Sequence, residues 1–377
     1  MPLNLREHTT DGARLRLEAS LRDVGSAAPC GLGCSACPDF GICGGLHLQN
    51  GFFDCGEMCC GSPKGCDGRM CRFNMADFAR RHIEVGGFEL ERIAPAPRND
   101  IAPLPVVVPM IYHGKRRLRG FEAPVVAVRL RDLYFKKIGA PRFASRAQLL
   151  DYFRISATAR IIVTGIDNDA VVERWWSLSQ QRQAILHNLK HDLGVDLVTV
   201  PNFSLAVSWP RWCDLYSMKR IGLSWHELST FGIAAALHPN GRTDNDFARW
   251  RRFIAARPEV THLSFEFTTG PGGPGQREKY AERLIQIARA AKRPLHLIVT
   301  GGQAVWPMLA AAFETLTVIE TSIFMKTQHR QRARQRGNGR LHYERVVTAP
   351  GAELADLMHK NACTIGARVQ QLAAAPL

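Results

Sequence analysis

The stretch THLSFEFTTGPGGPGQREKYAERLIQIARAAKRPLHLIVTGG, residues 261–302, contains two apolar runs on either side of a helical pattern. The runs at 263–267 and 295–300 are short, rich in branched and aromatic residues, and bounded by Gly or Pro, as buried strands are. Residues 277–291 have the spacing of an amphipathic helix. Two buried strands joined by a helix predict a parallel βαβ unit.

The same alternation extends through the chain from residue 105 onward. Further strands are predicted at 106–111, 125–130, 161–164, 197–200, 233–237 and 318–323. Further helices are predicted at 175–189, 209–220, 244–256 and 306–313. Eight strand–helix units in about 270 residues fit an α/β fold of the (β/α)8-type barrel class, and an open doubly wound parallel sheet is the alternative.

The N-terminal part of the chain has a different composition. Nine of the eleven cysteines lie between residues 30 and 71, in a Gly-rich stretch with little hydrophobic periodicity, which a bound metal would have to organise. We therefore predict an N-terminal helix and Cys-rich metal module at 1–93, a Pro-rich linker at 94–105 and a barrel-like domain at 106–377. The predicted ligands are Cys30, Cys34, Cys37, Cys43, Cys55, Cys59, Cys60, Cys66 and Cys71.

The number and spacing of these thiols bear on the metal. Four thiolates fill one tetrahedral site, so eight of the nine would fill two. Zinc knuckles usually come as two separated C-x2-C pairs, and only Cys34 and Cys37 form such a pair, which favours an Fe–S cluster of the [4Fe-4S] kind over zinc. The spacing of Cys30, Cys34 and Cys37 also resembles the cluster motif of the radical S-adenosylmethionine enzymes, although Ala36 stands where that family has an aromatic residue. That resemblance implies S-adenosylmethionine as a cofactor.

Catalytic side chains of a parallel barrel project from the C-terminal ends of its strands. Glu266 and Glu320 lie inside apolar runs there, and a carboxylate facing a barrel interior is costly unless it is paired, protonated or bound to a metal. We predict both as general acid/base groups or ligands, with His238 as a third catalytic candidate. The alternatives are structural ion pairs and a buried structural histidine. Neighbouring candidates for substrate binding are Asn202, Asn240, Gln303 and Lys326.

The net charge of +15 is concentrated in two stretches. Residues 101–150 hold ten Lys and Arg against two acidic residues, and residues 326–345 hold seven against one. In the second stretch Arg330, Arg332, Arg334 and Arg336 alternate with Gln and Ala. This pattern predicts a mobile basic arm at the barrel mouth that holds phosphate groups, so the expected partner is nucleic acid or another phosphate-bearing polyanion. The alternative is a solvated loop that binds nothing.

Membrane association is not expected. No apolar run reaches the roughly 18 residues that a membrane-spanning helix needs, and residues 1–10 lack the apolar core of a signal peptide. The expected location is the cytoplasm.

Residues 198–241 resemble a barrel-like domain family of unknown function found in phages and other mobile elements. The matching features are Pro201-Asn202-Phe203-Ser204, the aromatic helix that follows, the run 219–222 (KRIG), and the strand that ends in Pro239-Asn240; the VTGG at 299–302 also corresponds. The resemblance implies a barrel and a mobile-element context, and it carries no activity.

Two functions of different classes remain. The first is a metal-cluster-containing barrel enzyme that acts on nucleic acid or a phosphorylated substrate, with the reaction class open. The second is a non-catalytic, zinc-stabilised nucleic-acid-binding protein in which the barrel is a scaffold. A radical S-adenosylmethionine enzyme is a further alternative.

Overall fold

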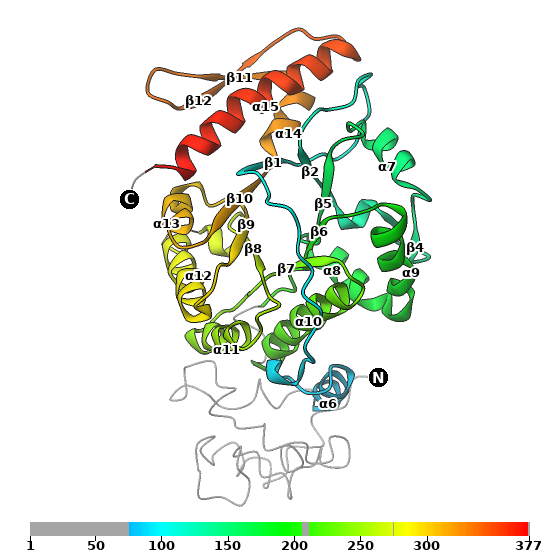
Figure 1. The fold of residues 1–377 in the computed structure, drawn as a ribbon, viewed down its shortest axis with the longest axis vertical. Coiled ribbons are helices and arrows are strands. Elements are labelled where there is room, and N and C mark those ends of the chain that lie inside the picture. Colours follow the sequence, from blue (N-terminus) through cyan, green and yellow to red (C-terminus); the bar gives the residue numbers. More distant parts are fainter. Residues whose placement is uncertain (1–74, 206–210, 274, 376–377) are drawn as a thin grey trace, which may run out of the picture. The chain divides into compact units, whose positions relative to one another are not determined.

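A computed structural model describes residues 75–205, 211–273 and 275–375 (Figure 1). The chain divides into two compact units, of which the larger consists of residues 95–203, 224–239 and 250–377. The described part of the smaller unit consists of residues 75–94, 204–205, 211–223 and 240–249. None of the helices in the described ranges is long and apolar enough to cross a membrane.

One parallel sheet of eight strands, in the order β1-β10-β9-β8-β7-β6-β5-β2, forms the centre of the larger unit. Its strands are β1 (Val107–Pro109), β2 (Val125–Arg129), β5 (Arg160–Thr164), β6 (Leu197–Thr199), β7 (Ala234–Leu237), β8 (His262–Glu266), β9 (His296–Thr300) and β10 (Thr315–Glu320). Its two edge strands also meet, because Met110 bridges to Ala127 and the Ile111 amide donates to the Ala127 carbonyl at 2.8 Å. The sheet is therefore a nearly closed barrel, and the predicted α/β class is confirmed.

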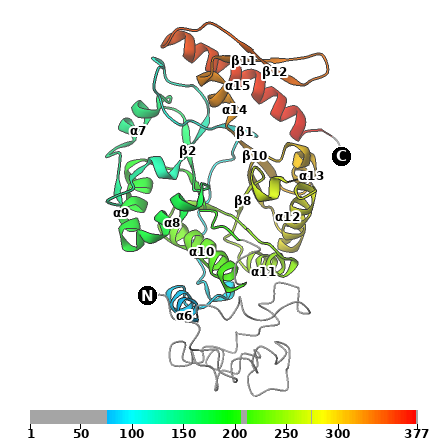
Figure 2. The ribbon, with the colours of Figure 1, turned by 180° about the vertical axis from the view of Figure 1, so that it is seen from behind.

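Helices connect the strands and lie outside the sheet (Figures 1 and 2). The α-helices are α6 (Met75–Glu84), α7 (Arg146–Phe153), α8 (Asp169–Ser177), α9 (Arg182–His187), α10 (Arg211–Thr230), α11 (Asp244–Ala255), α12 (Arg277–Ala291), α13 (Trp306–Ala310), α14 (Ser322–Gln328) and α15 (Ala352–Ala373). Shorter helical turns are η2 (Leu90–Arg92), η3 (Leu130–Asp132), η4 (Ser179–Gln181), η5 (Asn188–Asp192), η6 (Gly270–Gly272) and η7 (Gln303–Val305). In α12, Leu284 and Ile287 are fully buried at the three-residue spacing that gives a helix one apolar face.

Side chains that face into the barrel form its core. The buried cluster consists of Val108, Met110, Val125, Ala127, Ile162, Leu197, Ala234, Ala236, Ile298 and Ile319. Because alternate residues of a strand point to opposite faces, the next inward-facing residues toward the C-terminal ends are polar. Burial of each large apolar side chain stabilises such a core by about 1.5–3 kcal/mol.

Two connections differ from the regular pattern. Residues 111–124, between β1 and β2, contain no helix, and the basic run at 115–119 lies in this loop. Residues 326–345, predicted to be a mobile basic arm, instead contain an antiparallel hairpin of β11 (Gln331–Gln335) and β12 (Leu341–Arg345). The last barrel strand was expected at 318–323 but ends at Glu320, because the following residues begin α14.

The hairpin β11–β12 is fixed to the helices α14 and α15 by one buried side chain. The Asn361 amide nitrogen donates to the Thr327 hydroxyl at 3.0 Å and to the Gln331 carbonyl at 2.9 Å. Its oxygen accepts from the Ala333 amide at 2.8 Å. Asn361 is fully buried, so these bonds replace water for polar groups that the packing removes from solvent.

In the smaller unit, residues that carry the family resemblance have structural roles. The buried ammonium of Lys219 donates to the Glu89 carbonyl at 2.6 Å, and burial lowers the pKa of Lys219 to about 8. A Cβ at Gly222 would lie 2.4 Å from the end of the Ile93 side chain, so a larger residue would require Ile93 to shift.

Candidate functional site

A layer of polar residues lies at the C-terminal end of the barrel, above the apolar core. The sheet register aligns Arg129 with Thr164 and Thr164 with Thr199, and it aligns Glu266 with Thr300. The hydroxyls of Thr164 and Thr199 are hydrogen bonded at 3.2 Å. This is the end of a parallel barrel at which active sites are built.

The predicted catalytic residue Glu266 is buried and binds the loop that follows it. Its carboxylate accepts the amide and the hydroxyl of Thr268, the amide of Thr269 at 2.9 Å and the hydroxyl of Thr269 at 2.6 Å. These donors supply the hydrogen bonds that a buried carboxylate requires. The geometry therefore gives Glu266 the role of closing the turn after β8.

Glu320 is bound in a similar way at the end of β10. Its carboxylate accepts from the Ser322 amide at 2.7 Å and from the Ser322 hydroxyl at 2.6 Å, at the first residue of α14. Strand β9 lies between the strands of Glu266 and Glu320. Each of the two predicted catalytic carboxylates is thus occupied by donors of its own loop.

His238, the third catalytic candidate, is packed among aromatic rings. It is 3% exposed and stacks on Phe265 with ring centroids 5.3 Å apart, and the Phe265 ring also contacts Phe267 and Tyr280. Burial lowers the pKa of His238 to about 4, so the imidazole is neutral at pH 7. Its Nδ1 has no hydrogen-bond partner among the described residues. These contacts are those of a core histidine.

The glycine-rich loops near Glu266 pack tightly against the end of β8. Gly302 has a φ of +75°, and a Cβ there would lie 2.7 Å from the Phe267 ring. A Cβ at Gly272 would lie 2.2 Å from the Phe267 carbonyl oxygen. Both positions require glycine because the backbone approaches Phe267 so closely. In the part of the barrel end formed by β8, β9 and the loops that follow them, the polar groups and glycines are therefore packed and hydrogen bonded within the protein. We call this part the closed sector.

The predicted substrate-binding residues lie in different places. The Asn202 side chain accepts from the Asp167 amide at 2.9 Å, and Asp167 pairs with Arg131 at 3.0 Å, so Asn202 orders the loop after β5. Gln303 is exposed at the start of η7. Asn240 belongs to the smaller unit. The Lys326 ammonium lies 4.3 Å above the Tyr343 ring, a cation–π contact.

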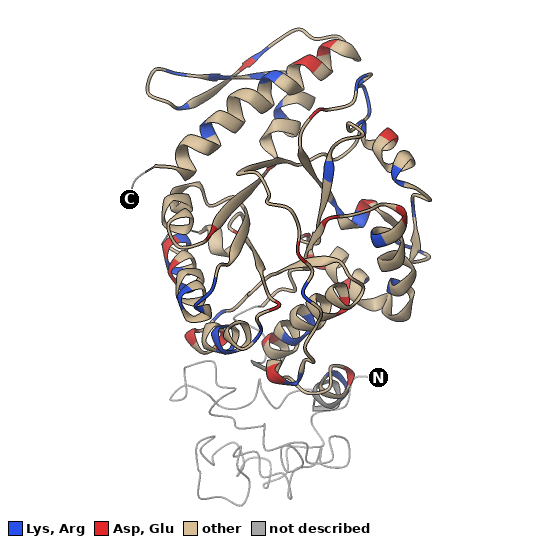
Figure 3. Ribbon diagram, viewed as in Figure 1, with Lys and Arg blue, Asp and Glu red and all other residues tan. Residues whose placement is uncertain are grey.

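The two basic stretches, about 200 residues apart in the sequence, come together in the fold. Strand β1 pairs with β10 and bridges to β2, so the segments that follow these three strands leave from one sector of the barrel end. The Gly351 amide, before α15, donates to the Arg116 carbonyl at 2.7 Å, and Arg119 pairs with Asp356 of α15. We call the residues 115–119, 129–142 and 326–345, which lie at or after the ends of β1, β2 and β10, the cationic sector. Figure 3 colours the lysines and arginines of the chain blue.

Some cationic side chains of this sector form hydrogen bonds or ion pairs within the protein. Arg117 is buried and donates to the Phe153 carbonyl at 2.6 Å. Arg330 donates to the Thr348 carbonyl at 3.2 Å, and Arg334 pairs with Glu344 at 2.7 Å. Of the four predicted phosphate-binding arginines, Arg330 and Arg334 thus have internal partners, and Arg332 lies opposite Glu344 in the hairpin register.

Other cations of the sector are exposed and form no ion pair or side-chain hydrogen bond within the described ranges. They are Lys115, Arg116, Lys136, Lys137, Arg336, Arg340 and Arg345. Lys136 and Lys137 were not singled out from the sequence, because two lysines between Phe135 and Ile138 form no recognisable motif. Exposed cations without an internal counter-charge attract polyanions.

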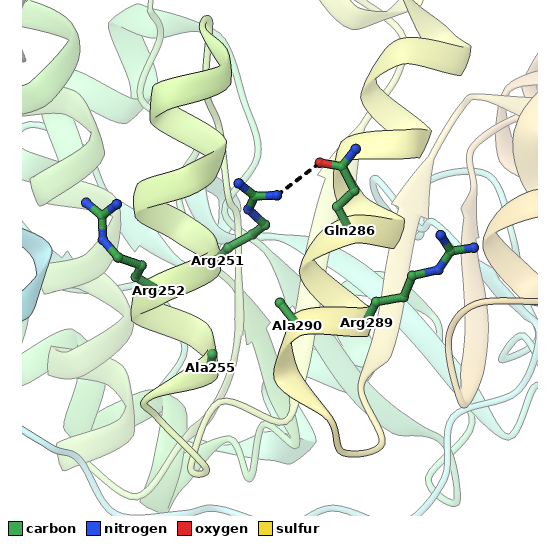
Figure 4. A pocket seen from close by; sticks show the side chains of 6 residues that line it. All are labelled: Arg251, Arg252, Ala255, Gln286, Arg289 and Ala290. Atoms are coloured by element: carbon green, nitrogen blue, oxygen red, sulfur yellow. Dashed lines mark hydrogen bonds between the residues drawn. The ribbon is translucent and has the colours of Figure 1, made fainter.

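A groove of about 520 Å³ lies within the cationic sector. Its lining residues are Arg131, Asp132, Tyr134, Phe135, Lys136, Lys137, Ile138 and Arg142. A second pocket, of about 360 Å³, lies between α11 and α12. There Arg251 reaches Gln286 at 3.3 Å, whereas Arg252 and Arg289 point away from that bond (Figure 4). The second pocket therefore has no set of arginines that converge on one anion.

The predicted metal ligands, Cys30 to Cys71, lie outside the described residues. Within residues 75–205, 211–273 and 275–375, no group of three or more His, Cys, Asp or Glu side chains is arranged to hold a metal ion. The chain matches no family model, and no curated protein is similar to it. The geometry of the barrel end is thus the basis for assigning a function.

Proposed function

We propose that the barrel unit binds a phosphate-bearing polyanion, with nucleic acid as the best-fitting class, on its cationic sector. The observation that carries the proposal is the pairing of β1 with β10, which joins the two most basic stretches of the chain at one end of the sheet. The side chains of Lys115, Arg116, Lys136 and Lys137 are exposed and form no ion pair or hydrogen bond with the described residues. An unpaired cation gains from each phosphate because bound counterions are released.

The proposal is tested with the full-length protein and a labelled single-stranded or double-stranded oligonucleotide, by fluorescence anisotropy between about 50 and 200 mM salt. Replacing Lys115, Arg116, Lys136 and Lys137 together by Ala should weaken binding about 30-fold or more and reduce the salt dependence. The matched control removes the same charge from α12 and the residue after it, by replacing Arg277, Lys279, Arg289 and Lys292. Equal affinities for the two variants would contradict the proposal.

A second candidate function is catalysis at the same end of the barrel, supported by the polar layer of Arg129, Thr164, Thr199, Glu266 and Thr300. Glu266 would then move a proton when a substrate displaces its loop donors. Glu266→Gln should abolish turnover and leave nucleic-acid affinity unchanged. The measurement is the rate at which an oligonucleotide is cleaved or modified. If Glu266→Gln and the native protein have the same rate, Glu266 does not have this role.

For the Cys-rich segment we propose an Fe–S cluster of the [4Fe-4S] kind rather than zinc. The support is the sequence alone, in the number and spacing of the cysteines from Cys30 to Cys71. Anaerobic purification followed by metal and sulfide analysis decides between the two, because a cluster contains acid-labile sulfide and absorbs near roughly 400 nm. Only a protein with a cluster would then be tested for S-adenosylmethionine binding.

A further inference from the structure

The turn between β3 (Tyr134–Phe135) and β4 (Ala140–Pro141) is held from two sides. Arg174 of α8 donates to the Lys136 carbonyl at 2.8 Å and to the Lys137 carbonyl at 3.0 Å. Gly139 has a φ of +64°, and a Cβ there would lie 2.5 Å from the Gln181 side chain. Because its backbone is fixed in this way, the turn presents residues 135–138 to solvent in a defined orientation.

This turn exposes two large apolar side chains between cations. Phe135 is 49% exposed and Ile138 is 65% exposed, and the two residues between them are Lys136 and Lys137. Single exposed apolar residues are common on protein surfaces. An aromatic ring and an aliphatic side chain beside unpaired ammonium groups, all on the rim of one groove, have the composition of a base-stacking platform.

The rest of the groove is pre-organised by internal contacts. The Arg142 guanidinium lies 4.3 Å from the centre of the Tyr152 ring and donates to the Asp132 carbonyl at 3.4 Å. Arg131 is fixed by its pair with Asp167. The volume of about 520 Å³ lies within the usual range of ligand sites. The side chains at its base thus need little ordering when a ligand enters.

We propose that this groove binds an unpaired segment of nucleic acid, with one base stacked on Phe135 and the adjacent phosphates on Lys136 and Lys137. The inference rests on the proposed function and specifies its ligand. A base in a duplex is already covered by neighbours on both faces, whereas an unpaired base has a free face for the Phe135 ring. An acidic peptide would satisfy the two lysines, but it offers a ring to Phe135 only where it contains an aromatic residue, whereas every nucleotide carries both a phosphate and a base.

The test compares a single strand of about 15 nucleotides with a fully paired duplex of the same length, by anisotropy on the full-length protein. Phe135→Ala should weaken single-strand binding about 10-fold and leave duplex binding within about twofold. Phe135→Trp should retain single-strand affinity, and its added fluorescence should be quenched on binding. Ile138→Ala is the matched control in the same turn and should change single-strand affinity less than Phe135→Ala does.

The outcomes separate this inference from the proposed function. If the fourfold charge variant loses affinity but Phe135→Ala does not, the polyanion function stands and base stacking is wrong. Equal losses for single strand and duplex would also overturn base stacking. If the unmodified protein binds neither oligonucleotide, both proposals fail. If Phe135→Ala converts a dimer into a monomer in sedimentation experiments, the turn is an interface between two copies, and the inference is overturned.

Discussion

Two sectors of the same barrel end differ in how their polar groups are satisfied. In the sector of β8 and β9, Glu266 accepts hydrogen bonds from its own loop and Gly302 packs against Phe267. In the cationic sector, Lys136 and Lys137 are exposed, with no internal partner in the described chain. In the first sector the polar groups form hydrogen bonds within the protein, whereas the second exposes cations that have no counter-charge among the described residues. A buried carboxylate in a strand is therefore weaker evidence of a site than unpaired charge beside a groove.

The largest effect is expected where the cationic sector depends on one buried amide. Asn361→Ala removes three hydrogen bonds and leaves the buried Ala333 amide without its acceptor, so it should lower the free energy of unfolding by about 3 kcal/mol. Polyanion affinity should also fall, because the hairpin loses its anchor. Urea denaturation measures the first effect, with Asn338→Ala in the exposed hairpin turn as the control. Stability equal to that of the control would refute the anchoring role.

The closed sector should be sensitive to loss of the Glu266 carboxylate. Glu266→Ala leaves the amides of Thr268 and Thr269 without an acceptor and should cost about 2 kcal/mol of unfolding free energy. Glu266→Gln keeps one acceptor oxygen, so its cost should be smaller, at about 1 kcal/mol or less. Urea denaturation of both variants checks this order. An alanine variant as stable as the native protein would show that the closed sector does not depend on this carboxylate.

Acid should weaken the closed sector through His238. The pKa of His238 is about 4 in the folded chain and 6.5 without burial, so between these values the unfolded chain binds a proton that the folded chain excludes. Its stabilising contribution is complete above pH 7 and falls as the pH drops from 6.5 to 4, by roughly 3 kcal/mol. The measurement is unfolding free energy against pH for the native protein and His238→Gln. Identical pH slopes would contradict the prediction.

The smallest effect concerns His113, which lies near cations of the cationic sector. Burial lowers the pKa of His113, and the positive charges of Lys115, Arg117, Arg116 and Arg129 lower it further. A bound polyanion compensates those charges, so the pKa of His113 should rise on binding. An NMR titration of the imidazole protons, with and without the oligonucleotide, measures the change. His238, whose pKa is lowered by burial, is the internal reference, and an unmoved His113 would place the ligand elsewhere.

Much of the barrel was predictable from the sequence. Strands at 125–130 and 295–300 were expected within a residue or so of β2 and β9, because buried parallel strands are short apolar runs that end at Gly or polar residues. The helix at 277–291 coincides with α12. The hairpin β11–β12 was not expected, because its alternating Arg and Gln give no apolar face, and its fold depends on the distant Asn361.

The site was less accessible to sequence reasoning. Glu266 and Glu320 were correctly placed at strand ends, but their donors, Thr268, Thr269 and Ser322, are local residues that also occur in ordinary turns. The cationic sector requires the pairing of β1 with β10, a contact between residues about 200 positions apart. No local pattern of charge encodes such a contact. The partners of Arg330 and Arg334 likewise follow from tertiary packing.

The packing of α15 has a consequence for biosynthesis. This helix, residues Ala352–Ala373, contacts the loop after β1 through Met358 and His359, which touch Arg117 and Phe121, and it anchors the hairpin. Strand β10, which pairs with β1, is also made late. While the ribosome is still translating residue 350, the basic segments emerge one by one without their common scaffold. The assembled cationic surface therefore depends on packing by residues that are synthesised late, and it forms only once α15 is free to fold.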